Sequence, residues 1–353
     1  MGRRSNSARA IAFGVAAGLA VVSKFSILVF LPATLGVAAV LWLACHGITP
    51  ERFSALRRSL PTLGIAILAG AFLIWATYRF SFHGVPAPEL FQGIADARAH
   101  NQQGHAAYLL GEVRQGGRWQ FFPILLAFKT PLALPLVVAL WAILPALRGR
   151  WRAVLLPLSF SIAVLGVGMA SNINIGLRHI LPIYIGIAIL AGAALEQLTG
   201  PVPERRWAAP LLGFLMLWFG ASSLLAHPDY LAYFNELAGG KPEEIAVDSD
   251  LEWGQDLKRV AARLRAANAT SLALFTFIRV DEKEQGLPPL AKSMERERPP
   301  AGWTAIDITN WIKTFGRNPD SGLWFNRIPP TEKVGAGYYL WYFPPAPSLG
   351  DGR

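Results

Sequence analysis

Hydrophobic and polar positions divide the chain into two parts. Up to residue 226, long apolar runs alternate with short basic segments, whereas after His227 the apolar runs shorten and charged residues become frequent. Apolar runs of about 17 to 25 residues are long enough to cross a bilayer as helices. Six such runs and one shorter run, the first, precede His227: 10–22, 26–44, 60–78, 131–147, 153–171, 180–198 and 208–226. This pattern predicts a mainly α-helical polytopic membrane protein with about seven spans.

The first two runs form a predicted helical hairpin. The polar segment 23–26, which contains Lys24, separates them and favours a turn over one continuous helix. An alternative is a signal peptide, because basic residues followed by about a dozen apolar ones are its usual pattern. No small-residue cleavage site precedes Lys24, and the apolar run resumes directly after Ser26, so the hairpin is preferred.

Composition and charge support a membrane protein. Charged residues make up 16% of the chain, against about 25% in soluble domains, and Cys45 is the single cysteine, which excludes a disulfide framework. The net charge of +10 is unevenly distributed. Residues 227–353 hold 15 Lys and Arg against 17 Asp and Glu, so the first 226 residues carry a net charge of +12. Because the basicity belongs to the apolar part, we expect no nucleic-acid partner.

Basic residues gather at one set of span ends, which is typical of the cytoplasmic face of a membrane. Four short segments carry eleven arginines, opposed only by Glu51 and Glu204: Arg3, Arg4 and Arg9; Arg52, Arg57 and Arg58; Arg148, Arg150 and Arg152; Arg205 and Arg206. We therefore expect a multi-pass protein of the cytoplasmic membrane. The loop 79–120, the segment 172–179 and the tail from His227 onward then lie on the outer, periplasmic or luminal face.

Two domains are predicted: a transmembrane helical domain, 1–226, with the outer loop 79–120, and a small extracytoplasmic α/β domain, 227–353. About 125 residues are enough for one small domain. Apolar positions at helical spacing predict an amphipathic helix over 252–268. Runs rich in β-branched and aromatic residues predict strands over 271–280, 303–308 and 338–343.

Four basic side chains are expected at the outer membrane surface: Lys24, Lys129, Arg178 and His179. The simpler interpretation is that they are interfacial residues whose polar ends reach water. The functional interpretation is an anion site, because guanidinium groups match phosphate oxygens and lipid phosphates lie at this depth.

The outer loop 79–120 contains further polar residues. A solvated surface helix is predicted over 88–104. His83, His100 and His105 with Asp96 could bind a divalent metal, but their spacing fits no zinc motif, so no metal ligand is assigned.

The segment 248–256 gathers four carboxylates, a Trp and a Gln: Asp248, Asp250, Glu252, Asp256, Trp253 and Gln255. In the structural interpretation, Asp250 caps the helix that begins near Glu252, and the early acidic residues favour its dipole. The alternative is a contact with a sugar or a metal, for which carboxylates beside an aromatic face are suitable.

Five runs of sequence resemble a known family. They are GLAVVSKFS at 18–26, FKTP at 128–131, NINIGLRHILP at 172–182, HPDYLAYFNELAGG at 227–240 and DSDLEWGQDL at 248–257. These runs are similar to the C-terminal two-thirds of bacterial membrane proteins of glycosyltransferase family 39, in the GT-C group. The group includes protein O-mannosyltransferases and the aminoarabinose transferases of lipid A. The resemblance implies a partial GT-C helical bundle.

The resemblance also implies an activity, the inverting transfer of a sugar from a polyprenyl-phosphate donor to an extracytoplasmic glycan, lipid or protein acceptor. In this family a carboxylate of the first outer loop acts as the base. That loop corresponds to no segment here, so the base is expected upstream of Met1. Lys24, Lys129, Arg178 and His179 are implied to stabilise the departing lipid phosphate. Residues implied to contact the sugar or acceptor are Asn174, Asp248, Asp250, Trp253, Gln255 and Asp256.

Two alternative functions remain open. One is a non-catalytic subunit that shares the fold and binds lipid-linked sugar or serves in assembly. The other is a transporter, which should carry ionisable residues in mid-span. Such residues are nearly absent here, so transport is the less favoured alternative.

Overall fold

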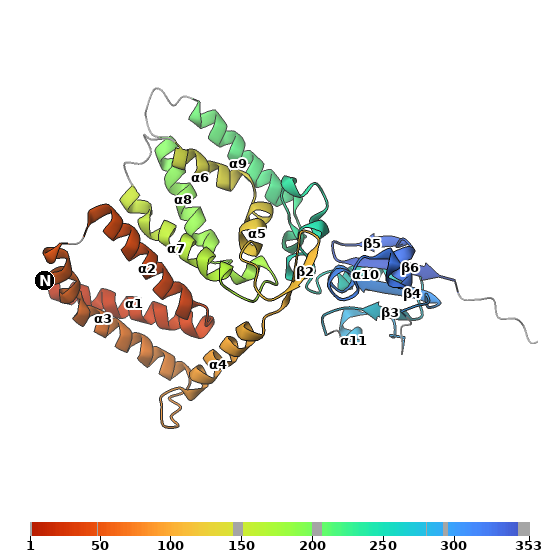
Figure 1. Cartoon of the computed structure of the whole chain (residues 1–353), viewed down its shortest axis with the longest axis horizontal. Helices are drawn as coiled ribbons and strands as arrows, with labels where there is room; N and C mark the ends of the chain where they lie inside the picture. Colours follow the sequence, from red (N-terminus) through yellow and green to blue (C-terminus); the bar gives the residue numbers. More distant parts are fainter. Residues whose placement is uncertain are drawn as a thin grey trace, which may run out of the picture.

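The computed structural model describes residues 2–47, 49–143, 151–199, 207–279, 281–291 and 296–344. It is mainly helical up to Leu225 and ends in a small region of sheet (Figure 1). The helices are α1 (Gly2–Ser23), α2 (Ile27–His46), α3 (Pro50–Thr77), α4 (Pro88–Gln103), α5 (Phe121–Lys129), α6 (Ala133–Ile143), α7 (Trp151–Met169), α8 (Ile183–Leu198), α9 (Ala208–Leu225), α10 (Leu257–Ala266), α11 (Glu282–Gln285) and α12 (Trp324–Arg327). Short helical turns are η2 (Leu177–His179), η4 (Tyr230–Ala232), η5 (Glu236–Ala238), η6 (Pro242–Glu244), η7 (Asp248–Asp250), η8 (Asn310–Phe315) and η9 (Pro319–Ser321).

Four described segments are long and apolar enough to cross a membrane: Asn6–Ser23, Ile27–His46, Arg57–Thr77 and Ala208–Leu225. A fifth candidate is the pair α5 and α6, which meet at an angle of 107°. Val154–Met169 and Ile183–Leu198 are shorter apolar helices. The membrane character expected from the sequence is therefore supported, and the count of seven spans stays a prediction. Residues 144–150 and 200–206, which hold four of the predicted cytoplasmic arginines, lie outside the described residues.

The first two apolar runs are separate helices, as predicted. They are broken at Lys24, and each packs mainly on a different partner, α1 on α3 and α2 on α7. Small residues allow the backbones of α1 and α3 to approach closely. A Cβ atom at Gly70 would lie 2.8 Å from the carbonyl oxygen of Gly14, and one at Gly18 would lie 2.9 Å from that of Gly70.

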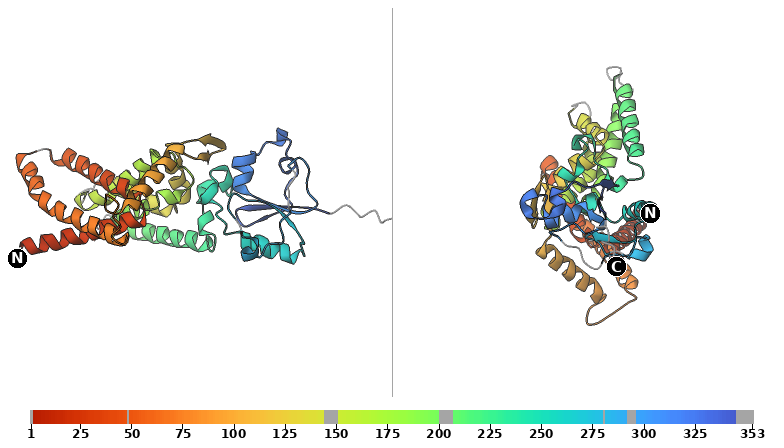
Figure 2. Two further views of the ribbon diagram at one scale, coloured as in Figure 1. Left: turned by 90° about the horizontal axis from the view of Figure 1, so that it is seen from below. Right: turned by 90° about the vertical axis from the view of Figure 1, so that its right-hand side faces the viewer.

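The ends of these helices form two sets. The ends at which α2, α6 and α8 finish and α3, α7 and α9 begin lie remote from the sheet (Figures 1 and 2). The junction of α1 and α2, the end of α7 and the end of α9 lie toward it. The orientation of these two sets of ends relative to a membrane stays a prediction.

The C-terminal sheet has the strand order β3-β4-β6-β5. Its strands are β3 (Leu272–Phe275), β4 (Gly302–Asp307), β5 (Glu332–Val334) and β6 (Tyr338–Phe343); β3 and β4 are parallel and the other pairs antiparallel. The apolar face of α10 packs on the sheet through Val260 and Leu264, against Leu340. The three predicted strands are present. The strand β5 was not predicted, because its three residues carry no alternating pattern.

One predicted helix boundary is wrong. The helix expected from residue 252 begins only at Leu257, since the chain before it forms the turn η7 and a glycine turn at Gly254. Asp250 therefore does not cap this helix.

The loop 79–120 contains the predicted surface helix, α4, which has no fully buried residue. It is followed by an antiparallel pair, β1 (Ala106–Leu109) and β2 (Glu112–Gln115). The amide of Leu110, in the turn of this pair, donates to the carbonyl of Ile245 over 3.0 Å. The loop therefore connects the helical part to the C-terminal part.

Candidate functional site

A cavity of about 720 Å³ lies where four segments meet: the junction of α1 and α2, the helix α4, the end of α7, and η2. Most of its wall is apolar. The apolar lining includes Phe25, Phe30, Ile94, Phe122 and Ile180. Its size and lining are typical of a site for a small or elongated apolar ligand.

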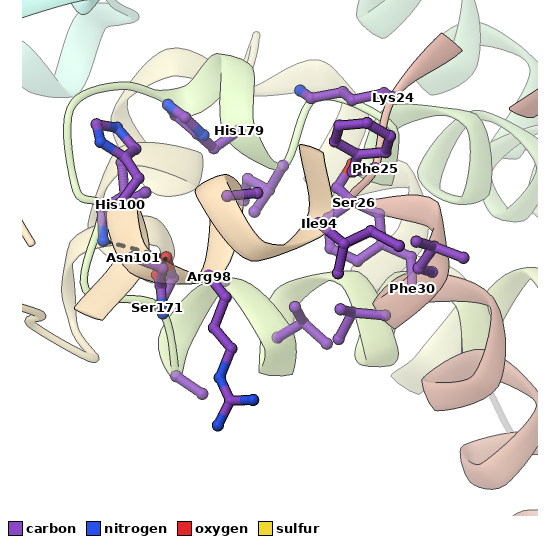
Figure 3. A pocket seen from close by; sticks show the side chains of 18 of the residues that line it. Lys24, Phe25, Ser26, Phe30, Ile94, Arg98, His100, Asn101, Ser171 and His179 are labelled. Atoms are coloured by element: carbon purple, nitrogen blue, oxygen red, sulfur yellow. Dashed lines mark hydrogen bonds between the residues drawn. The ribbon is translucent and has the colours of Figure 1, made fainter. Parts of the chain in front are cut away.

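Nitrogen-bearing side chains line one side of this cavity. Figure 3 shows Lys24, His100 and His179 along the same side, whereas Arg98 points away from them. No carboxylate is present among the described lining residues, and none pairs with Lys24 or Arg98 in the part of the chain that the structure describes. The arrangement therefore offers an apolar chamber with a positively charged edge.

His179 lies between two charged neighbours. Burial, followed by the positive charges of Lys24 and Arg178, lowers the pKa of its imidazole to about 4. The ring is therefore neutral at pH 7, and its Nε2 atom is buried without a hydrogen-bond partner in the described structure. A neutral imidazole can donate or accept one hydrogen bond from this position, but it adds no charge.

His100 and His105 form a pair beside the cavity, with their Nε2 atoms 3.1 Å apart. Burial, followed by the charge of His100, lowers the pKa of His105. Asp96 instead accepts a hydrogen bond from Gln92. Within the described ranges, no three His, Cys, Asp or Glu side chains are grouped so that they could hold a metal ion.

Lys129, expected in the same site as Lys24, does not line the cavity. Its side chain is only 9% exposed, and its ammonium donates to the carbonyls of Asp250 over 2.6 Å and Leu231 over 2.8 Å. The Asp250 carboxylate lies 3.7 Å from it and also accepts the amide of Leu177. Burial raises the pKa of Asp250, and the charge of Lys129 opposes that effect. This pair fastens α5 to η7 and η2.

Arg178 is exposed and stacks on Trp253, with its guanidinium carbon 4.0 Å from the ring centroid. Trp253 in turn packs against Phe277 at 5.4 Å and remains 44% exposed. Arg178 precedes His179 in the sequence, but Arg178 and Trp253 are not among the described residues that line the cavity. Among the expected sugar contacts, Trp253 and Gln255 are the exposed ones in the described structure.

The remaining expected contacts are engaged within the protein. Asn174 is buried and accepts the amide of Arg118 over 2.6 Å. Gln255 caps its own turn by accepting the amide of Trp253 and donating to the carbonyl of Leu251.

Two expected carboxylates also have protein partners. Asp248 pairs with Lys313 at 2.6 Å and lies at a left-handed φ of 68°. Asp256 accepts the amides of Ala336 and Gly337 and pairs with Arg259. Their contacts are those of residues that hold the turn 248–256 against the sheet.

Glu252, a carboxylate of the 248–256 segment that was not among the implied sugar or acceptor contacts, lies in the same turn. Glu252 is fully buried, and burial followed by the charge of Asp256 raises the pKa of its carboxyl to about 8. A Cβ atom at Gly337 would collide with the Glu252 carboxylate, so the glycine leaves the space that this acid occupies. The cavity residues Arg98 and Asn101 were missed as well. The sequence signal for these two residues was the predicted helix 88–104. Its hydrophobic periodicity did not show which face of the helix packs against other elements.

No model of a known protein family, no curated protein and no solved structure matches this chain. The resemblance to glycosyltransferase family 39 therefore remains an expectation from the five sequence runs.

Proposed function

We propose that this chain binds a polyprenyl-phosphate-linked sugar at the outer face of the cytoplasmic membrane and forms the donor-binding part of a glycosyltransferase of the GT-C type. The observation that carries the proposal is the cavity, whose described lining holds no carboxylate and whose apolar chamber adjoins Lys24 and His179. A polyprenyl chain needs apolar surroundings, and its phosphate needs a cation and hydrogen-bond donors. In this proposal the protein has seven spans and an extracytoplasmic C-terminal domain.

The proposal gives the basic residues different roles. Lys24 carries the charge that holds the donor phosphate, and His179 supplies a neutral hydrogen bond. Arg178 and Trp253 form the neighbouring surface on which the sugar or acceptor rests. Lys129 positions the turn 248–256 through its contacts with Asp250 and does not touch the ligand.

A second function is favoured by the same lining. The described cavity wall contains no carboxylate, the type of base that the resemblance implies for a transferase. The chain would then bind lipid-linked sugar without transferring it. Incubation of the reconstituted protein with a radiolabelled polyprenyl-phosphate sugar and membrane acceptors separates the two functions, since only a transferase moves label to the acceptor.

Donor binding is tested with the full chain in lipid nanodiscs, by titration with a polyprenyl phosphate. We expect Lys24→Gln to weaken binding about tenfold, the effect of losing one charge-assisted hydrogen bond at an exposed site. Arg98→Gln is the matched control, because Arg98 lines the same cavity and points away from Lys24 and His179. Equal losses in both variants, or no loss in Lys24→Gln, would contradict the proposal.

A further inference from the structure

A hairpin after α3 exposes apolar side chains close to a candidate membrane span. We name residues 78–91 the aromatic hairpin. Its exposed apolar residues are Phe80, Phe82, Val85 and Phe91, each between 45% and 60% exposed. Single exposed apolar residues are ordinary on a protein surface, but a cluster of them marks a contact surface.

Hydrogen bonds fix the shape of the hairpin. Phe82 pairs with Pro86 in an antiparallel bridge. The carbonyl of Ser81 accepts both the amide of Ala87, over 3.0 Å, and the indole of Trp75, over 2.8 Å. These contacts join both ends of the hairpin to the last turns of α3. The conformation of its tip is therefore fixed by hydrogen bonds.

The backbone also holds unfavourable conformations. Arg79, Phe80 and Ala87 adopt φ angles of 54°, 56° and 49°, in the left-handed region that residues other than glycine rarely occupy. Such conformations persist only when the surrounding structure imposes them. Here they turn the chain so that the aromatic side chains face outward.

The exposed surface of the hairpin continues that of α3. The Phe80 ring lies 5.9 Å from the Phe72 ring and 5.2 Å from the Trp75 ring, centroid to centroid. Phe72 is itself exposed, as is Leu68 one turn earlier. Both belong to the candidate span Arg57–Thr77, whose exposed apolar residues would face lipid. The hairpin therefore begins where that span ends.

We propose that the aromatic hairpin inserts into the outer leaflet of the bilayer, at the level of the lipid head groups. Aromatic side chains favour this depth, and the exposed Arg79 is placed to meet lipid phosphates. The next element, α4, lines the cavity with Ile94 and Arg98. Anchoring the hairpin thus holds this wall of the cavity at the membrane surface. The anchoring does not depend on which ligand occupies the cavity.

The test uses site-directed nitroxide labels on the full chain in nanodiscs of phosphatidylcholine and phosphatidylglycerol. Since Cys45 is the single cysteine, Cys45→Ser gives a background for Phe82→Cys. The label's accessibility to oxygen, which concentrates in lipid, is compared with its accessibility to a water-soluble nickel chelate. Leu110→Cys, in the exposed turn between β1 and β2, is the matched control in water, and Leu68→Cys is the control in lipid.

We expect the ratio of oxygen to nickel accessibility at Phe82 to exceed that at Leu110 several-fold and to approach that at Leu68. Val85→Cys gives an independent site on the same hairpin if Phe82→Cys is poorly expressed. A ratio at both hairpin sites equal to that at Leu110 would overturn the proposal, and it would mark the hairpin as a water-exposed surface available to a protein partner.

Discussion

The cavity and the C-terminal part of the chain, from residue 227 onward, differ in how they hold charged residues. In the cavity, Lys24 adjoins apolar walls and has no described carboxylate partner, whereas Lys129, where α5 meets the C-terminal domain, is buried against Asp250 and two carbonyls. The sequence placed both lysines in one phosphate site. Residue type and position at a span end therefore do not distinguish a cation that lines a cavity from one whose charge is neutralised inside the protein; the partners of each charge do.

The largest effect, a loss of stability, is expected when the buried pair of Lys129 and Asp250 is disrupted. Asp250→Asn keeps the shape of the side chain but leaves the buried ammonium of Lys129 without its counter-charge. Removing one partner of a buried ion pair costs about 3 kcal/mol or more. We expect the variant to unfold at clearly lower temperature in nanodiscs, measured by loss of near-ultraviolet circular dichroism.

Glu244→Gln is the control for this experiment, because the pair of Lys241 and Glu244 is exposed on both sides. Exposed pairs contribute little, so its unfolding temperature should equal that of the unchanged protein. If Asp250→Asn behaves in the same way, Lys129 is not held by this pair and returns to the candidates for phosphate binding.

A somewhat smaller effect on stability is expected from the pH dependence of the buried acid Glu252. The pKa of Glu252 is raised to about 8 by burial and by Asp256, while in the unfolded chain it is about 4.3. Between these values the folded state binds the proton and the unfolded state does not, so stability falls as pH rises. We expect the free energy of unfolding to decrease by up to about 1.4 kcal/mol per unit between pH 6.5 and 8.

Burial also raises the pKa of Asp307, to about 6, which lies below this range of pH. Glu252→Gln keeps a neutral side chain at every pH and should make the decline shallower; Asp250, whose pKa burial also raises, is present in both proteins. The exposed Glu112→Gln should retain the full decline. An unchanged slope in Glu252→Gln would show that another group is responsible.

The sequence predicted the elements better than the site. Apolar runs predicted the helices because a helix in lipid must be apolar around most of its surface. The strands β4 and β6 were predicted because their β-branched and aromatic residues favour extended backbone. The cavity was only partly predictable, since it brings Lys24 beside His100 and His179 from distant parts of the chain. The burial of Glu252 depends on space left by Gly337, which no local pattern records.

The smallest effect is expected on ligand binding, from the cavity residue His179. Charges that face it come from Lys24 at the end of α1, from Arg178 on η2, and from His100 and His105 when protonated. Because its pKa is lowered to about 4, the ring is neutral at both pH 6 and pH 8. We expect His179→Gln to weaken binding of a polyprenyl phosphate by about fivefold, the effect of one neutral hydrogen bond.

The same ratio of dissociation constants between His179→Gln and the unchanged protein is expected at pH 6 and pH 8. The lipid phosphate itself titrates near pH 6, but it does so for both proteins, so the ratio cancels this change. A ratio that grows tenfold on going from pH 8 to pH 6 would show that bound phosphate charges the imidazole. His179 would then act as a second cation beside Lys24, and the cavity would hold its ligand more tightly in acid.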